Sequence, residues 1–300
     1  MTENEIRLDD GTVVRTGLLL PDERAVKVAA TYADYPEKYF KDKSDIEKSL
    51  KGDVYKQMRK RRQRFITNQG GLSQCNASAT VNAFHNRRDL DGMPHVVLSS
   101  TYLYMHINGG KDRGSMLADG FEFSKQGIAP RILTVKGEKV TFPGNVYLKR
   151  QVSSELLAAA NAEAQFFSSW EAFKLPKDNF ETFKIALASA LANDHQVIHA
   201  WHVGRASSRL SNGYVQQGRG NGNHATLFHS GKWVGGADLV HPDCENSWGP
   251  SVDPMYGPVG SGWGDNGFGL FTMQSAFQCT RYHDFWVLTG NKINERSLAA

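Results

Sequence analysis

The sequence predicts an α+β protein with two lobes, a helical lobe followed by one built around an antiparallel sheet. Segments with helical apolar spacing dominate residues 75–192, and an apolar, strand-like segment follows at 196–203. Residues 204–290 are rich in Gly, Trp and Tyr, with short strand candidates between turn residues. Because helices that precede strands in this way segregate from the sheet, we expect the lobes to face each other across a cleft.

The composition is typical of a globular protein and limits the kinds of partner. Of 300 residues, 40% are hydrophobic and 22% are charged, and the formal net charge is only +4. This charge is too small to indicate a nucleic-acid partner, and we find no apolar run long enough to cross a membrane. The first residues, "MTENEIRLDDG", lack the apolar core of a signal peptide. We therefore expect neither a membrane nor a nucleic acid as partner.

The cysteine content predicts a fold without disulfide bonds. Cys75, Cys244 and Cys279 form a sparse, odd set, which suits an intracellular, reducing compartment. We find no Cys-x-x-Cys or His-x-x-x-His pair, and the nearby His241 and Asp243 belong to a short Pro-containing segment that fits a loop. We therefore predict no metal site and no cofactor.

The first part of the chain is the hardest to assign. We treat residues 1–55 as an N-terminal extension, which could be an arm, a small subdomain or an inhibitory segment. Residues 44–64 predict a charged helix with Ser44 as its N-cap and Glu47 three residues later. Its basic run at 58–64, "MRKRRQR", we interpret as a solvated helix end.

The remaining elements follow from apolar spacing. Ala77, Val81 and Phe84 form one stripe of a helix that begins at Cys75 and ends near residues 86–92. Other helices are expected after residues 98–104, around 116–123, over 153–174 and over 179–192. Strands are expected at 196–203, 224–229, 233–240, 268–273 and 285–290.

The segment "NQGGLSQCNASATVNAF", residues 68–84, indicates a reactive thiol. Cys75 stands between a Gly-rich loop and a helix, and a helix N-terminus stabilises a thiolate through its dipole. An activated thiol needs an imidazole as proton partner and a polar group that orients the ring. His224, in "GNGNHATLFH", follows small residues, and Asn246, in "ENSWGP", offers an amide oxygen to the ring.

Two more residues complete the predicted site. Trp248 can shield the hydrogen bond between the imidazole and the amide from water. Gln69, six residues before Cys75, can pair its side-chain NH2 with the Cys75 backbone N–H as donors to an oxyanion.

These motifs together resemble the papain-like cysteine peptidases. The segment 68–84 resembles the family's Gln-Gly-x-Cys-Gly-x-Cys-Trp, and "LSSTYLYMHINGGKDRGSMLADGFEFSKQGI" resembles the stretch that contains Cys-Asn-Gly-Gly. "GNHA" at 222–225, "NSWG" at 246–249 and "GWGDNGF" at 262–268 resemble the family's later motifs in the same order. The resemblance covers about residues 60–290.

The resemblance implies a two-lobed papain-like fold and a role for each site residue. The peptidase domain would span 56–290, with a helical lobe at about 65–195, a β lobe at about 196–290 and a tail at 291–300. Cys75 would be the nucleophile, His224 the general base and then acid, Asn246 the orienting amide and Gln69 the oxyanion donor. Substrate binding would fall to Asn108, Gly109, Gly110, Asn223 and Trp248, and the substrate would be a peptide or protein.

The chain departs from the family pattern at several places. Leu72 and Ile107 replace the two halves of a usual disulfide, so we predict that these side chains touch. Asn76 follows the nucleophile where the family has Trp. A Pro-rich insertion at 250–261 is expected near the cleft, where it could narrow access or bind a protein partner, as could the N-terminal extension.

Two alternatives stay open at this stage. The chain could be a structural or interaction component of a large assembly, such as a phage or virus particle, with or without activity. The same triad could also pass the acyl group to an acceptor other than water, or cut an amide other than a main-chain peptide bond.

Overall fold

The computed structural model describes residues 5–7, 13–62, 69, 72–93, 96–135, 138–141, 154–167, 170–203, 210–216, 222–248, 251–253, 257–259, 263–281 and 283–291. The tail beyond Asn291 and much of the 250–261 insertion therefore lie outside the described residues. Of the insertion, only two short paired strands are described, β11 (Ser251–Asp253) and β12 (Gly257–Val259).

An eight-stranded sheet forms the centre of the molecule. Its strand order is β5-β14-β6-β9-β10-β13-β8-β7, and the pairs are antiparallel except β8 with β13. The bounds are β5 (Trp170–Lys174), β6 (Gln196–Val203), β7 (Leu210–Ser211), β8 (Tyr214–Val215), β9 (Gly222–Gly235), β10 (Leu239–Glu245), β13 (Phe268–Leu270) and β14 (Trp286–Asn291). Two-stranded ribbons also form from β1 (Glu5–Arg7) with β2 (Val13–Arg15) and from β3 (Ile132–Val135) with β4 (Glu138–Thr141).

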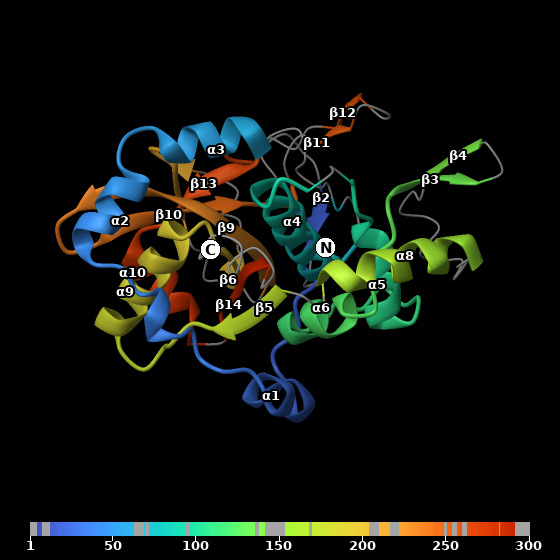
Figure 1. Ribbon diagram of the computed structural model, residues 1–300, viewed down its shortest axis with the longest axis horizontal. Coiled ribbons are helices and arrows are strands. Elements are labelled where there is room, and N and C mark those ends of the chain that lie inside the picture. The colour runs from blue at the N-terminus through green and yellow to red at the C-terminus, as the bar shows by residue number, and fades with distance from the viewer. Residues whose placement is uncertain are drawn as a thin grey trace, which may run out of the picture.

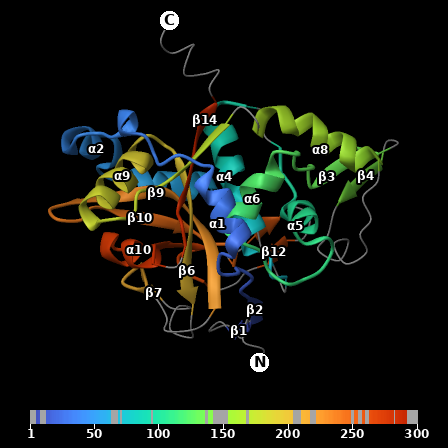
Figure 2. The same cartoon turned by 90° about the horizontal axis from the view of Figure 1, so that it is seen from below.

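Helices cover both faces of this sheet. They are α1 (Glu23–Ala30), α2 (Lys43–Leu50), α3 (Val54–Arg62), α4 (Cys75–Leu90), α5 (Ser100–Asn108), α6 (Leu117–Ser124), α8 (Ser154–Phe167), α9 (Phe180–Ala192), α10 (Met273–Cys279) and the 3-10 turn η1 (Glu37–Tyr39). Figures 1 and 2 show α2, α9 and α10 at one side of the sheet and α4, α5 and α6 at the other. The structure is thus the α+β arrangement that the sequence predicts.

Each face of the sheet contributes to its own hydrophobic cluster. In β6, Val197 and Trp201 join the cluster that α2, α9 and α10 cover, whereas Ile198 and Ala200 join the cluster of α4, α5 and α6. Successive strand residues point to opposite faces, so a strand covered on both sides needs apolar residues throughout. This explains why "QVIHAWHV" reads as a continuous apolar run.

The described part of the N-terminal extension divides between these two clusters. Tyr35, Ile46 and Leu50 are buried with α9 in one cluster, and Leu18 and Ala29 are buried in the other. Helix α9 also packs with α2 and α10 rather than with α4 and α5. These contacts cross the predicted boundaries near residues 55 and 195, and the domain division stays a prediction.

Two predicted helices differ from the structure. The helix expected over 44–64 is two helices, because Gly52 between them adopts a φ of +81°. The first is capped by Asp42, whose carboxylate accepts a hydrogen bond from the Asp45 N–H at 2.8 Å, rather than by Ser44. The helix expected over 153–174 ends at Phe167, because residues from Trp170 onward pair with β14.

The basic run at 58–64 is not simply a solvated helix end. Arg62 is fully buried, and the Arg59 side chain is only 13% exposed. Both form ion pairs with carboxylates of β10, Arg59 with Asp243 and Arg62 with Glu245. The prediction was wrong for these two residues because a charge run in a sequence does not reveal buried partners.

Within the described residues, no helix is both long and apolar enough to cross a membrane.

Buried histidines make the stability of this fold depend on pH. Burial lowers the pKa of His195 to about 3 and that of His283 to about 4, because the charged ring loses its water. Tyr35 lies beside His195, with its hydroxyl 2.9 Å from the His195 Nδ1 atom.

We expect the free energy of unfolding to fall between pH 7 and pH 5, by up to about 2 kcal/mol for His195 alone. The unfolded chain binds a proton on this ring below about pH 6.5, whereas the folded ring stays neutral until about pH 3. Urea denaturation of the wild type and His195→Gln at both pH values measures this loss. The variant should lose less stability, and an equal loss would contradict the assignment.

Candidate active site

Cys75 is the first residue of α4, as predicted. Its side chain is fully buried, and burial raises the pKa of the thiol. Backbone hydrogen bonds from Ala225 and Gly17, and from the first turn of α4 itself, oppose this rise. The thiol therefore lies against β9 at the residue that follows His224.

His224 is held by Asn246. The His224 Nε2 atom lies 2.7 Å from the Asn246 Oδ1 atom, and Asn246 is fixed in turn by its N–H bond to the Gly267 carbonyl at 3.0 Å. With an amide oxygen facing it, Nε2 carries the hydrogen, so Nδ1 is left as the acceptor of the ring. Within the described residues, Nδ1 of His224 has no hydrogen-bond partner.

Trp248 covers the ring of His224. The two rings stack with centroids 4.1 Å apart and planes inclined by 20°. His224 is fully buried, and burial lowers its pKa to about 4, although the Asn246 hydrogen bond acts in the opposite direction. In this state both the thiol and the imidazole are neutral at pH 7.

Gln69 is held by Ser247. The Ser247 Oγ atom donates to the Gln69 Oε1 atom at 2.6 Å, and the Gln69 N–H donates to the Ser247 carbonyl at 3.0 Å. The side-chain NH2 is thereby turned away from Ser247. It donates to the Arg15 carbonyl at 2.6 Å and to the Leu72 carbonyl at 2.9 Å.

Residues 15–19, which we call the occluding segment, lie over the thiol. The Arg15 carbonyl takes the hydrogen bond from Gln69, and the Gly17 backbone acts to lower the pKa of the Cys75 thiol. The Leu18 N–H donates to the Asn223 carbonyl at 3.2 Å. The segment therefore occupies the amide of Gln69 and the carbonyl of Asn223, the residue before His224.

The opposite edge of this segment pairs with the loop before α6. The Ser115 N–H donates to the Gly17 carbonyl at 2.7 Å, and the Leu19 N–H donates to the Ser115 carbonyl at 2.9 Å. Asp112 anchors the segment further through the Arg15 guanidinium, whose Nη1 lies 3.3 Å from Oδ2 of Asp112. Leu18 and Ser115 form a β-bridge in which the two chain segments run parallel.

Close approach at two glycines makes this fit possible. A Cβ atom on Gly17 would lie 1.9 Å from the Ser73 carbonyl oxygen, and one on Gly114 would lie 2.3 Å from the Gly17 carbonyl oxygen. Gly114 also has a φ of +78°, which favours glycine. No larger residue fits at position 17 while the segment stays in place.

The predicted substrate residues fall into two groups. Asn223 and Trp248 lie at the site, with the contacts given above. Asn108 and Gly109 form the end of α5, where Gly109 is a left-handed cap and the Gly110 N–H bonds to the Met105 carbonyl at 3.2 Å. The observed pairing with an extended segment occurs at Ser115, so substrate binding by residues 108–110 stays a prediction without support from this pairing.

The aliphatic pair proposed for the missing disulfide borders one hydrophobic cluster. Ile107 is buried in the cluster of α4, α5 and α6, and Leu72 packs against the same cluster. Their direct contact stays a prediction. The three cysteines are free, and among the described residues no group of three or more His, Cys, Asp or Glu side chains could hold a metal ion.

Several residues that shape the site were not predicted. Gly17, Ser115 and Ser247 act through backbone or hydroxyl contacts that leave no periodic signal in a sequence. Ser247 stands within "NSWG", so its position beside Asn246 was the one available clue.

No model of a protein family matches the sequence, and a search of curated proteins finds no match. Among solved structures, the chain is similar to xylellain, a cysteine protease from Xylella fastidiosa, with a TM-score of 0.62 and 18% identity over 92% of this chain and 96% of that chain. The fold is papain-like.

Two further structures with this papain-like fold are proenzymes by name. The chain is similar to proCathepsin B S9 from Trypanosoma congolense, with a TM-score of 0.55 and 12% identity over 92% of this chain and 86% of that chain. It is also similar to digestive procathepsin L 3 from Tenebrio molitor larval midgut, with a TM-score of 0.50 and 16% identity over 75% and 66% of the two chains.

We expect Gly17→Leu to expose the thiol in the full-length chain. The added side chain meets the Ser73 carbonyl, so the occluding segment must leave its position. Alkylation of Cys75 by iodoacetamide at pH 7, followed by mass spectrometry, should then be at least about tenfold faster than in the wild type, because the thiol regains water and its pKa falls.

Leu20→Ala is the matched control for this variant. Leu20 lies one residue beyond the occluding segment and is 55% exposed, so its truncation should leave the alkylation rate unchanged. Equal rates for Gly17→Leu and the wild type would contradict the occluding role of residues 15–19.

Proposed function

We propose that the protein is a cysteine peptidase that hydrolyses peptide bonds through Cys75, His224 and Asn246. The observation that carries this proposal is the hydrogen bond from His224 Nε2 to Asn246 Oδ1, while the backbone of Ala225, the next residue of β9, acts to lower the pKa of the Cys75 thiol at a helix N-terminus. This arrangement leaves the other ring nitrogen free to accept a proton. The papain-like fold supports peptidase chemistry in general.

In the proposed reaction, His224 accepts a proton and then donates it in each of the two steps, acylation and deacylation. His224 Nδ1 takes the thiol proton, and the thiolate of Cys75 attacks the substrate carbonyl to form a tetrahedral intermediate. The imidazolium gives the proton to the leaving amine, which leaves a thioester. Water, deprotonated by His224, then releases the acid and the free thiol. Asn246 keeps the ring in the tautomer that these transfers require.

Gln69 would stabilise the oxyanion of the intermediate. Its NH2 group is aimed at a carbonyl oxygen, that of Arg15, which lies in an extended segment across the thiol. A substrate carbonyl in place of Arg15 would receive the same hydrogen bond, together with the backbone N–H of Cys75. The Arg15 contact supports a place for the oxyanion beside the Gln69 NH2 group.

We infer that a peptide or protein substrate replaces the occluding segment. The backbone of Ser115 offers one donor and one acceptor, and the Asn223 carbonyl offers a further acceptor. An extended peptide can satisfy all of these by β-strand addition. The protein with residues 15–19 in place would then be an inactive precursor, in line with the N-terminal extension acting as an inhibitory segment.

No contact in the described residues favours a purely structural component of a larger assembly. The N-terminal segment does lie over the site, but His224 keeps its hydrogen bond with Asn246 and its stacking with Trp248. A blocked site with intact internal geometry fits a reversible occlusion better than a site that has lost its chemistry. The acceptor could still differ from water, which product analysis distinguishes.

The proposal predicts that peptide hydrolysis by the Gly17→Leu protein depends on the triad. Cys75→Ala should abolish cleavage of a fluorogenic peptide library, because no nucleophile remains. Gln69→Ala should lower kcat by about 10²- to 10³-fold, because one oxyanion donor is lost. Mass spectrometry of the products should show free carboxylates, as water is the acceptor.

Cys279→Ala serves as the control, since Cys279 lies in α10 within the hydrophobic cluster on the other face of the sheet. Its hydrolysis rate should match that of the Gly17→Leu parent. A folded parent protein whose freely alkylated Cys75 supports no cleavage of any peptide would overturn the proposal.

A further inference from the structure

The end of β10 and the residues after it present alternate side chains to two different groups of partners. The even-numbered residues face the imidazole: Asn246 bonds to His224, and Trp248 stacks on it. The odd-numbered residues contact Arg59, Arg62 and Gln69, the last of which is the proposed oxyanion donor. β10 itself ends at Glu245, and the alternation continues through Asn246, Ser247 and Trp248, of which Ser247 lies in a turn.

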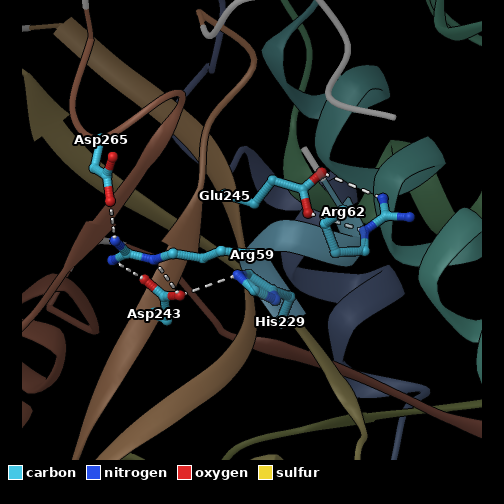
Figure 3. Close-up of polar contacts among 6 residues, drawn as sticks. All are labelled: Arg59, Arg62, His229, Asp243, Glu245 and Asp265. Carbon is cyan, nitrogen blue, oxygen red and sulfur yellow. Dashed lines mark hydrogen bonds and ion pairs between the residues drawn. The ribbon is translucent and has the colours of Figure 1, made fainter. Parts of the chain in front are cut away.

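Three successive odd positions bind these three residues, as Figure 3 shows for the first two. Asp243 receives a bidentate pair from Arg59, with Nε–Oδ2 at 2.8 Å and Nη2–Oδ1 at 2.6 Å. Glu245 receives a second pair from Arg62, with Nε–Oε2 at 3.3 Å and Nη2–Oε1 at 3.4 Å. Ser247 makes the two hydrogen bonds to Gln69 described above.

The first pair is extended by neighbouring groups. The Nε2 atom of His229, on β9, lies 3.3 Å from Oδ2 of Asp243. Arg59 also reaches Asp265, with Nη1 2.9 Å from Oδ2, but that carboxylate is 62% exposed. The second pair is less exposed to solvent than the first, because the side chains of Arg62 and Glu245 are 1% and 0% exposed.

Of the two elements that the ion pairs join, β10 is held by neighbouring strands and α3 is a short helix. β10 is hydrogen-bonded to β9 on one edge and to β13 on the other, so its position is set by the sheet. α3 is a nine-residue helix, and Arg62 is its last residue. Gln69 follows seven residues later in the chain. The ion pairs therefore tie Arg59 and Arg62 to a strand that the sheet holds in place, and Ser247 ties Gln69 to the residues that follow the same strand.

A buried ion pair is a poor way to gain stability, because desolvation of both charges offsets most of their attraction. Its bidentate geometry does fix the relative position of the two groups. At this site the pair joins Arg62, seven residues before Gln69, to Glu245, the residue before Asn246. Positioning is the role for which such a pair is well suited.

We propose that Arg62 and Glu245 are positioning residues that hold Gln69 in register with the His224–Asn246 pair, with Ser247 setting the orientation of the Gln69 amide. This inference rests on the proposed peptidase function. It predicts that loss of the pair impairs stabilisation of the oxyanion while the reactivity of the thiol stays intact.

The test replaces both charges at once, Arg62→Met with Glu245→Met, in the full-length Gly17→Leu protein. Two apolar side chains of similar length avoid leaving one buried charge without its partner. We expect kcat for a fluorogenic peptide to fall by about 10- to 100-fold, as for a misplaced catalytic group, with KM within about twofold. Affinity for a peptide aldehyde, whose thiol adduct carries the oxyanion, should fall by the same factor.

Two readouts separate positioning from a general loss of structure. The pH profile of Cys75 alkylation by iodoacetamide should be unchanged, because that reaction needs the thiolate and not Gln69. In a Gln69→Ala background, the double substitution should cause no further loss of kcat, since the donor it positions is already gone.

A matched control is the Arg88→Met, Glu163→Met protein. This pair is also largely buried, with side chains 5% and 13% exposed, and it joins α4 to α8. Arg88 lies 13 residues along α4 from Cys75, about 20 Å at the rise of an α-helix. Its removal should leave kcat and aldehyde affinity unchanged.

Hydrogen exchange provides an outcome that does not depend on activity. In the full-length protein, Arg62→Met with Glu245→Met should speed exchange of the Gln69 N–H, which bonds to the Ser247 carbonyl, while β10 amides keep their rates. If the Gly17→Leu parent hydrolyses no peptide, the proposed function fails, and this exchange still decides the positioning role.

Unchanged kcat and unchanged Gln69 exchange in the double variant would overturn the inference. A change in the pH profile of Cys75 alkylation that accounts for the whole loss of kcat would also overturn it, because the ion pair would then act on the thiol and the imidazole. A further loss in the Gln69→Ala background equal to that in the parent would also overturn it.

Discussion

The alternation of side chains at the end of β10 is the constraint on which the rest of the site depends. Ladders to β9 and β13 fix β10 as far as Glu245, and the next two residues present Asn246 to the imidazole and Ser247 to Gln69. A shift of this strand by one residue would exchange the two sets of partners. His224, the proposed proton-transfer group, and Gln69, the proposed oxyanion donor, therefore contact adjacent residues, although they come from distant parts of the sequence.

A second constraint is the close approach of backbones around Cys75. Gly17 and Gly114 allow the occluding segment to lie within hydrogen-bonding distance of Ser115 on one side and Asn223 on the other. The segment covers the thiol and Trp248 covers the imidazole, and burial shifts the pKa values of both groups toward the neutral forms. Under the proposed function, departure of residues 15–19 would return water to the thiol and free the backbone groups of Ser115 and Asn223 together.

Local sequence was sufficient for the parts of the site that local structure determines. Cys75 could be placed at a helix N-terminus from apolar spacing, and His224 and Asn246 stood out by the residues around them. Long-range pairing was not predictable in this way. Trp170–Lys174 continues a helical pattern but pairs with β14, and Arg62 lies in a charge run but is buried against Glu245. The occluding segment gave no signal either, because it acts through backbone atoms that every residue has.

The most direct measurement is a crystal structure of the Gly17→Leu protein after reaction with a peptidyl epoxide. We predict a thioether at Sγ of Cys75, His224 Nε2 still bonded to Asn246, and the peptide backbone paired with Ser115 in place of residues 17–19. The NH2 of Gln69 should face the bound ligand where it now meets the Arg15 carbonyl. A structure in which the epoxide has reacted elsewhere, or in which His224 lies out of reach of the modified sulfur, would contradict the account.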